Sequence, residues 1–159
     1  MSDIATEATV TVLQGLPGSG KSSHAEQWRA ADPERRVVVN RDQIRFHLYR
    51  QYSGLSRIQE DLVTGVEFRL ADLALRQRKS VMVDNTNLRQ EYVDQWARLA
   101  DRHGVACAVV TIGTPLGECL RRNRARAAAG GRFVPESVIR EMSRTAQWAG
   151  GPGGHDQIA

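Results

Sequence analysis

The stretch GLPGSGKS at residues 15–22 constrains this chain more than any other part of its sequence. It has the pattern G-x-x-x-x-G-K-S, which is typical of a loop that binds phosphate. The apolar run at residues 9–13 predicts a buried strand before the loop, and residues 23–31 predict a helix after it. This order favours a phosphate site over the alternative, a plain glycine-rich turn before a helix.

The residue types of this loop suit the chemistry of a phosphate group. Glycines let the backbone amides face inward, and these amides attract anions together with the positive N-terminus of the helix. Lys21 can reach the β- and γ-phosphates of a nucleotide, and the Ser22 hydroxyl can bind Mg²⁺. We therefore predict ATP or another nucleoside triphosphate as the phosphate donor, with Mg²⁺. The predicted donor-binding residues of the loop are Gly15, Gly18, Ser19, Gly20, Lys21 and Ser22.

Length and composition bound the class of protein. A chain of 159 residues with 41% apolar and 25% charged residues predicts one globular domain, which we place at residues 9–149. We expect residues 1–8 to be a loose lead-in and residues 150–159 to be a disordered tail. The sequence predicts neither a membrane span nor a secretory signal, so we expect a cytoplasmic protein. Cys107 and Cys119 lack metal-ligand spacing, and we expect both to be reduced.

The net charge of +4 leaves two interpretations open. Only Lys21 and Lys79 are lysines, so the cations are nearly all arginine. This can be a bias in composition, or it can indicate a partner rich in phosphate. The total does not decide between them, whereas the placement of the arginines does.

Apolar runs and helical patterns alternate along the rest of the chain. Strands are predicted at residues 36–40, 80–84 and 105–112, and helices at residues 41–49, 56–78, 89–103, 116–129 and 136–148. The alternation predicts an α/β fold with a parallel sheet of about four strands and helices on both faces. In the long helix, one apolar stripe at helical spacing is expected to face the core. It consists of Leu62, Val66, Leu70, Leu73 and Ala74.

Polar residues follow two of these strands, at the edge of the sheet where such folds bind ligands. Asp42 and Arg45 share a helix face, so the acid could accept a proton while the arginine holds a phosphate. Spacing alone favours the alternative, a first-turn acid that stabilises the helix and pairs with Arg45. Asp84 ends a hydrophobic strand and could bind Mg²⁺; its alternative is a turn residue. Because the chain has a phosphate loop, we favour the metal role for Asp84.

The segment at residues 121–132, which we call the lid segment, carries five arginines and no acid. Arg122 and Arg126 are four residues apart, and like charges at this spacing destabilise a helix unless an anion lies between them. Two glycines follow, which could let the segment move. We predict a lid that presents arginines to a triphosphate, with a solvated basic surface as the alternative.

Together, these motifs resemble the 5′-kinase domain of bacteriophage-type polynucleotide kinases over residues 10–148. The family's phosphate loop matches residues 15–22, and its asparagine-arginine-aspartate motif with a following arginine matches residues 40–45. Residues 63–65 with Phe68, residues 86–88, and the lid segment with Val134-Pro135 are similar too. The family pattern has an acid at the position of Asn85, whereas the acid of this chain is Asp84. This leaves open which of the two takes that role.

The resemblance implies a role for each matching residue. Asp42 is the general base that takes the proton of a 5′-hydroxyl, and Arg45 holds the phosphate 3′ to the reacting nucleotide. Arg126 contacts the donor phosphates with support from Arg122. The implied catalytic residues are Lys21, Asp42, Arg45 and Arg126, the metal residues are Ser22 and Asp84, and the acceptor residues are Arg45, Asn85 and Thr86.

The activity that this resemblance implies is an ATP-dependent polynucleotide 5′-hydroxyl kinase of nucleic-acid end repair. Its partner would be single-stranded or end-accessible DNA or RNA with a 5′-hydroxyl. The signature D-x-D-x-T does not occur, so we expect no 3′-phosphatase activity. Two alternatives stay open: a P-loop kinase of a sugar, nucleoside or antibiotic, and a non-catalytic nucleic-acid-binding module switched by ATP.

Overall fold

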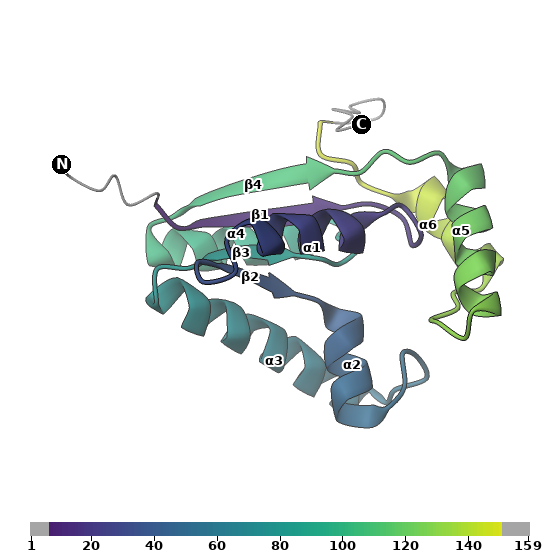
Figure 1. The fold of residues 1–159 in the computed structure, drawn as a ribbon, viewed down its shortest axis with the longest axis horizontal. Coiled ribbons are helices and arrows are strands. Elements are labelled where there is room, and N and C mark those ends of the chain that lie inside the picture. Colours follow the sequence, from purple (N-terminus) through teal and green to yellow (C-terminus); the bar gives the residue numbers. More distant parts are fainter. Residues whose placement is uncertain (1–6, 151–159) are drawn as a thin grey trace.

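A computed structural model describes residues 7–150 and contains one four-stranded parallel sheet with the strand order β2-β3-β1-β4 (Figure 1). The strands are β1 (Thr9–Gln14), β2 (Arg36–Val39), β3 (Ser80–Val83) and β4 (Ala106–Thr111). The helices are α1 (Lys21–Ala31), α2 (Arg41–Tyr49), α3 (Arg57–Arg76), α4 (Gln90–His103), α5 (Leu116–Ala128) and α6 (Glu136–Thr145). The predicted α/β fold is confirmed. The expected lead-in and tail lie mainly at residues 1–6 and 151–159, outside the described residues.

Helices cover both faces of the sheet because successive strand residues point to opposite sides. On one face, strand valines such as Val12 and Val83 pack against residues of α3 and α4, among them the buried Trp96. On the other face, Leu13 and Met82 pack against α1. The two layers hold the loop before α1 at the carboxyl edge of the sheet.

Local caps fix the ends of three helices. The Asn40 side chain accepts a hydrogen bond from the backbone N–H of Gln43 and caps α2. Ser56 and Gln59 form both bonds of a capping box on α3. Gly104 ends α4 in the left-handed region, with φ of 65°. These caps start α2 and α3 at fixed residues beside the sheet edge.

The expected core stripe of α3 is largely wrong. Leu62, Leu70 and Leu73 are 51%, 43% and 42% exposed, and Val66 is only partly buried. The helix instead buries its other face, which consists of Val63, Glu67, Ala71, Ala74 and Leu75. The carboxylate of Glu67 lies in the middle of that face, so apolar spacing alone favours the more continuous leucine stripe.

Two further expectations need smaller corrections. The strand at residues 105–112 is not fully buried: Ala106 and Ala108 are exposed, because β4 is an edge strand that pairs only with β1. The last helix begins at Glu136 as predicted, with Pro135 as its N-cap, but ends at Thr145 instead of residue 148. Among the described residues, none of the helices combines the length and the apolar character needed to cross a bilayer.

Candidate active site

A pocket of about 660 Å³ opens at the carboxyl edge of the sheet, between the phosphate loop, α2 and α5. It brings together residues that are up to 115 positions apart in the sequence, from 17 to 132. Its lining residues are Pro17, Gly18, Gly20, Lys21, Ser22, Ser23, Asn40, Asp42, Asp84, Asn85, Thr86, Arg122, Arg126 and Arg132. Three predicted site residues, Gly15, Ser19 and Arg45, lie beside this pocket without lining it.

The phosphate loop has the backbone that its glycines allow. Gly18 and Gly20 have φ of 80° and 100°, a region that side-chain-bearing residues rarely adopt. A Cβ on Gly18 would also lie 2.5 Å from the carbonyl oxygen of Cys119, so α5 packs directly on the loop. Since α1 begins at Lys21, the amides of its first turn have no acceptor within the helix and suit an anion.

Lys21 is the buried cation of the pocket. Its side chain is 8% exposed, and its ammonium donates to the carbonyl oxygens of Gly15 and Leu16 at 2.9 and 2.8 Å. Burial lowers the pKa of Lys21 to about 8, although Asp84 opposes this shift. A bound phosphate would supply the negative charge that stabilises the ammonium form.

Asp84 and Asn85 point in different directions. The Asp84 carboxylate is 6% exposed, lines the pocket and accepts a hydrogen bond from the Asn40 amide at 2.7 Å. The Asn85 side chain accepts from the Arg41 backbone N–H at 2.9 Å and donates to Glu67 at 2.6 Å. The Asn85 side chain thus joins α2 to α3. Of these two residues, only Asp84 offers a carboxylate to the pocket. Mg²⁺ binds such oxygen ligands, and the Ser22 hydroxyl lines the same pocket.

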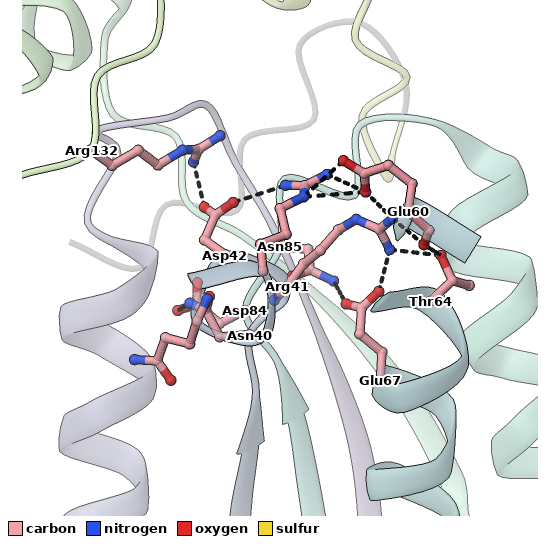
Figure 2. Close-up of polar contacts among 11 residues, drawn as sticks. Asn40, Arg41, Asp42, Glu60, Thr64, Glu67, Asp84, Asn85 and Arg132 are labelled. Atoms are coloured by element: carbon pink, nitrogen blue, oxygen red, sulfur yellow. Dashed lines mark hydrogen bonds and ion pairs between the residues drawn. The ribbon is translucent and has the colours of Figure 1, made fainter. Parts of the chain in front are cut away.

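A network of ion pairs joins the arginines of α2 to the acids of α3 (Figure 2). The Arg41 guanidinium donates to Glu60 at 2.6 Å and to Glu67 at 2.5 Å. Burial raises the pKa of Glu67, while its bonds to Asn85 and Arg41 oppose the rise. Arg45 donates to Glu60 and to one carboxylate oxygen of Asp42, each at about 3 Å. The Asp42–Arg45 ion pair, expected if Asp42 only stabilises the helix, is therefore present. The same pair also orients the Asp42 carboxylate, which lines the pocket.

Arg132 is the site residue that sequence reasoning missed. It follows α5 and bonds the second carboxylate oxygen of Asp42, so Asp42 lies between two guanidinium groups (Figure 2). Burial lowers the pKa of Arg132, and Asp42 opposes this shift. The sequence placed Arg132 in the lid segment but gave no sign of its partner, since 90 residues separate the two.

The lid segment is anchored to the phosphate loop. Arg122 donates to the Ser19 carbonyl oxygen at 3.4 Å and to Glu118 at 2.7 Å. Arg126 donates to the Arg132 carbonyl oxygen at 2.8 Å. Glu118, one turn before the lid segment, pairs with Arg122 and offsets its repulsion from Arg126. A bound anion is therefore not required for the two arginines to share a helix face. Both arginines still line the pocket.

The turn that ends the lid segment is closed by a buried side chain. Asn123 is fully buried, donates to the Val134 carbonyl oxygen at 2.7 Å and accepts from its N–H at 3.1 Å. On the other side of the pocket, Thr86 lines the wall, and its carbonyl oxygen accepts from the Gly15 N–H at 3.1 Å. The segment after β3, through Thr86, and the lid segment, through Arg122, are thus both bonded to the phosphate loop.

Comparison with known proteins gives the family and the fold of the chain. The model of one protein family, described as an AAA domain, matches residues 10–148. A protein of Autographa californica nuclear polyhedrosis virus, named as a bifunctional polynucleotide kinase/RNA ligase, is 27% identical over 127 residues. That match covers 72% of this chain but 18% of the viral protein.

Solved structures show the same fold. A chain of the Pnkp1/Rnl/Hen1 RNA repair complex matches with a TM-score of 0.74 and 26% identity, over 87% of this chain and 44% of that chain. The APS kinase CysC of Mycobacterium tuberculosis, solved with AMPPNP and APS, matches with a TM-score of 0.63 and 22% identity, over 92% of this chain and 86% of that one. The present chain therefore spans less than half the length of its nucleic-acid-related matches, and nearly all of a small-molecule kinase with this fold.

Proposed function

Because the chain belongs to the AAA domain family and has a P-loop kinase fold, we propose that it is an ATP-dependent polynucleotide 5′-hydroxyl kinase. It would transfer the γ-phosphoryl group of ATP, or of another nucleoside triphosphate, to the 5′ end of DNA or RNA during end repair. One observation carries the proposal: Asp42, held between Arg45 and Arg132, shares a pocket with Lys21 of the phosphate loop. The polynucleotide kinase/RNA ligase named above and the RNA repair complex support a nucleic-acid acceptor.

The donor half of the proposed site consists of the phosphate loop, Asp84 and the lid segment. Lys21 neutralises charge on the β- and γ-phosphates, and Arg126 does so from the lid with Arg122 beside it. Ser22 and Asp84 would hold Mg²⁺, which supplies further charge neutralisation to the phosphates. These residues position and stabilise charge, which is most of what phosphoryl transfer requires.

The acceptor half consists of Asp42 and the arginines around it. Asp42 accepts the proton of the 5′-hydroxyl as the oxygen attacks the γ-phosphorus. Arg45 grips the phosphate on the 3′ side of the reacting nucleotide, while Glu60 keeps the guanidinium oriented. A sugar or antibiotic acceptor without a phosphate gives no reason for two arginines on one carboxylate.

The test is a transfer assay with γ-labelled ATP. Single-stranded DNA and RNA with 5′-hydroxyl ends are compared with a panel of sugars, nucleosides and adenylyl sulfate, and Lys21→Ala serves as the inactive control. We expect label on the oligonucleotides, and none with the control variant. Label on a small molecule but not on oligonucleotides would establish the first alternative, which the fold shared with APS kinase keeps open. Retention of oligonucleotide without label transfer would establish the non-catalytic module.

The proposal excludes a second repair activity in residues 9–149, which we take as the kinase domain. The D-x-D-x-T signature of a 3′-phosphatase does not occur in this sequence. We therefore expect 3′-phosphorylated oligonucleotides to keep their phosphate during the same assay.

A further inference from the structure

Two aromatic side chains form an exposed stack at the end of α2. The rings of Phe46 and Tyr52 lie with their centroids 4.9 Å apart and an angle of 16° between their planes. The Arg50 guanidinium lies 5.6 Å from the centroid of the Phe46 ring. Phe46 nevertheless stays 39% exposed. The stack therefore leaves part of its aromatic surface open to solvent, where another flat group could contact it.

This stack lies on the acceptor side of the pocket. Asp42, Arg45 and Phe46 are at positions i, i+3 and i+4 of α2, so they share one helix face. Tyr52, in the connection between α2 and α3, is close enough to Arg132 to interact with it electrostatically. The proposed base, the arginines beside it and the stacked rings therefore follow one another along the same side of the molecule.

The connection that follows the lid segment carries another exposed aromatic residue. Phe133 follows Arg132 directly and is 54% exposed. Because Arg132 bonds Asp42, the backbone that carries Phe133 lies close to the start of α2. Figure 1 shows the α5–α6 connection and α2 on opposite sides of the open end of the sheet. A further exposed aromatic residue thus follows directly after the arginine that bonds Asp42.

The chemistry of this surface suits single-stranded nucleic acid. Cations that bind phosphate, here Arg45 and Arg50, alternate with rings on which bases stack, and this combination is typical of single-strand binding. Glu60, the acid nearest to Arg45, is already bonded to Arg41 and Arg45 and does not repel a phosphate backbone as a free acid would.

Resting on the proposed function, we propose that Phe46 and Tyr52, together with Arg50, form a stacking platform for a base of the acceptor strand. Phe46 lies beyond Arg45 when α2 is followed from Asp42. The platform therefore takes a base downstream of the reacting nucleotide, and the acceptor must be unpaired there. The reacting nucleotide itself would not touch it.

Kinetics with two acceptors separate the platform from the catalytic site. We expect Phe46→Ala to raise the KM of a single-stranded 5′-hydroxyl octamer by at least about fivefold, as loss of one stacked base would. The KM of a nucleoside 3′-monophosphate, which cannot reach the platform, should change by less than twofold. Phe46→Trp should restore octamer binding, because tryptophan keeps a stacking surface. Tyr92→Ala, which removes a ring 44% exposed on α4, is the matched control and should leave both KM values unchanged.

A binding measurement makes the result independent of catalysis. An octamer with 2-aminopurine at its second or third nucleotide should lose fluorescence on binding the wild-type protein, because stacking quenches this base. Phe46→Ala should abolish the quenching, with circular dichroism confirming that the variant is folded. If the wild type shows no quenching, or if Phe46→Ala changes both acceptors equally, the platform is wrong. If quenching occurs but no oligonucleotide is ever phosphorylated, the platform stands and the kinase proposal fails.

Discussion

Asp42 is the residue on which the proposed chemistry depends. Both of its carboxylate oxygens are bonded to arginines, one to Arg45 and one to Arg132. We expect Asp42→Asn to keep its fold and its ATP affinity but to lose phosphoryl transfer by at least about 100-fold, because an amide cannot accept the proton. Single-turnover transfer to a 5′-hydroxyl octamer measures this loss, and titration with ATP checks donor binding. Transfer within tenfold of the wild type would remove Asp42 as the base.

Lys21 gives the donor site a pH dependence whose sign is fixed by its environment. Burial lowers its pKa to about 8, and a phosphate prefers the ammonium form. Above pH 8 the free protein has lost this proton, so ATP binding must be accompanied by proton uptake. We expect ATP affinity to be constant below about pH 7.5 and to fall toward tenfold per pH unit above pH 8. Calorimetry in buffers of different ionisation enthalpy measures the proton uptake directly.

A matched variant tests whether Lys21 is the group responsible. Lys21→Met removes the titrating amine and should bind ATP weakly but with little pH dependence between pH 7 and 9.5. If this variant shows the same fall in affinity as the wild type, another group is titrating.

For single residues, the sequence predicts roles that depend on a local motif but not contacts between distant side chains. The roles assigned to Lys21 and Ser22 follow from a local pattern, because the loop that presents them is contiguous in the chain. The contact between Arg132 and Asp42 does not, since it depends on how α5 packs over the phosphate loop. The same holds for Asn85, whose amide is used by Glu67 and the Arg41 backbone in a network that only the folded chain assembles.

The element that best shows how pattern and packing differ is α3. Its predicted ends, residues 56 and 78, both agree with the structure within two residues. Its core face does not, because a helix with two apolar stripes can pack on either. The choice depends on Glu67, which is 3% exposed and is buried only because Arg41 and Asn85 bond its carboxylate. No periodicity contains that information.

The exposed stripe of α3 leads to a prediction about stability. Leu73 is 42% exposed, whereas Leu75 is 5% exposed in the core. We expect Leu73→Ala to change the free energy of unfolding by about 1 kcal/mol or less, and Leu75→Ala to lower it by about 2–4 kcal/mol through lost burial and a cavity. Urea denaturation of the three proteins measures the difference. Equal losses for the two variants would mean that the leucine stripe is covered in solution.

At the scale of the whole molecule, alternating strand and helix patterns were enough to predict the fold class, the helices on both faces and the edge of the sheet at which the pocket opens. The alternation of strands and helices does not determine which strand lies at the edge of the sheet, or which of its residues are exposed to solvent. The strand β4 has apolar residues like a central strand, yet it is an edge strand because the described chain supplies no further strand to pair with it. Exposure of Ala106 and Ala108 is a property of this topology and not of the local sequence.

The net charge of +4 also needs the whole structure to be interpreted. Many exposed arginines are paired with neighbouring acids, such as Arg121 with Glu118 and Arg89 with Glu91, and add little to a long-range field. Arg45 and Arg132 lie beside Asp42, and Arg50 lies beside the Phe46 ring, so these three are the cations of the proposed acceptor half. Acceptor binding should therefore depend on a small local set of cations and not on a broad basic surface.

Salt dependence tests this conclusion, because each phosphate neutralised on a single strand contributes about 0.7 to the slope of log KM against log salt concentration. Three local cations predict a slope of about 2 for a single-stranded 5′-hydroxyl octamer. The assay would cover NaCl concentrations from about 50 to about 300 mM. Arg50→Gln should lower the slope by about 0.7, whereas Arg121→Gln, on the outer surface of α5, should leave it unchanged. A slope above about 4 would instead require a broad basic surface. A slope near zero would mean that none of these cations neutralises a phosphate of the octamer, which would contradict an acceptor site built for nucleic acid.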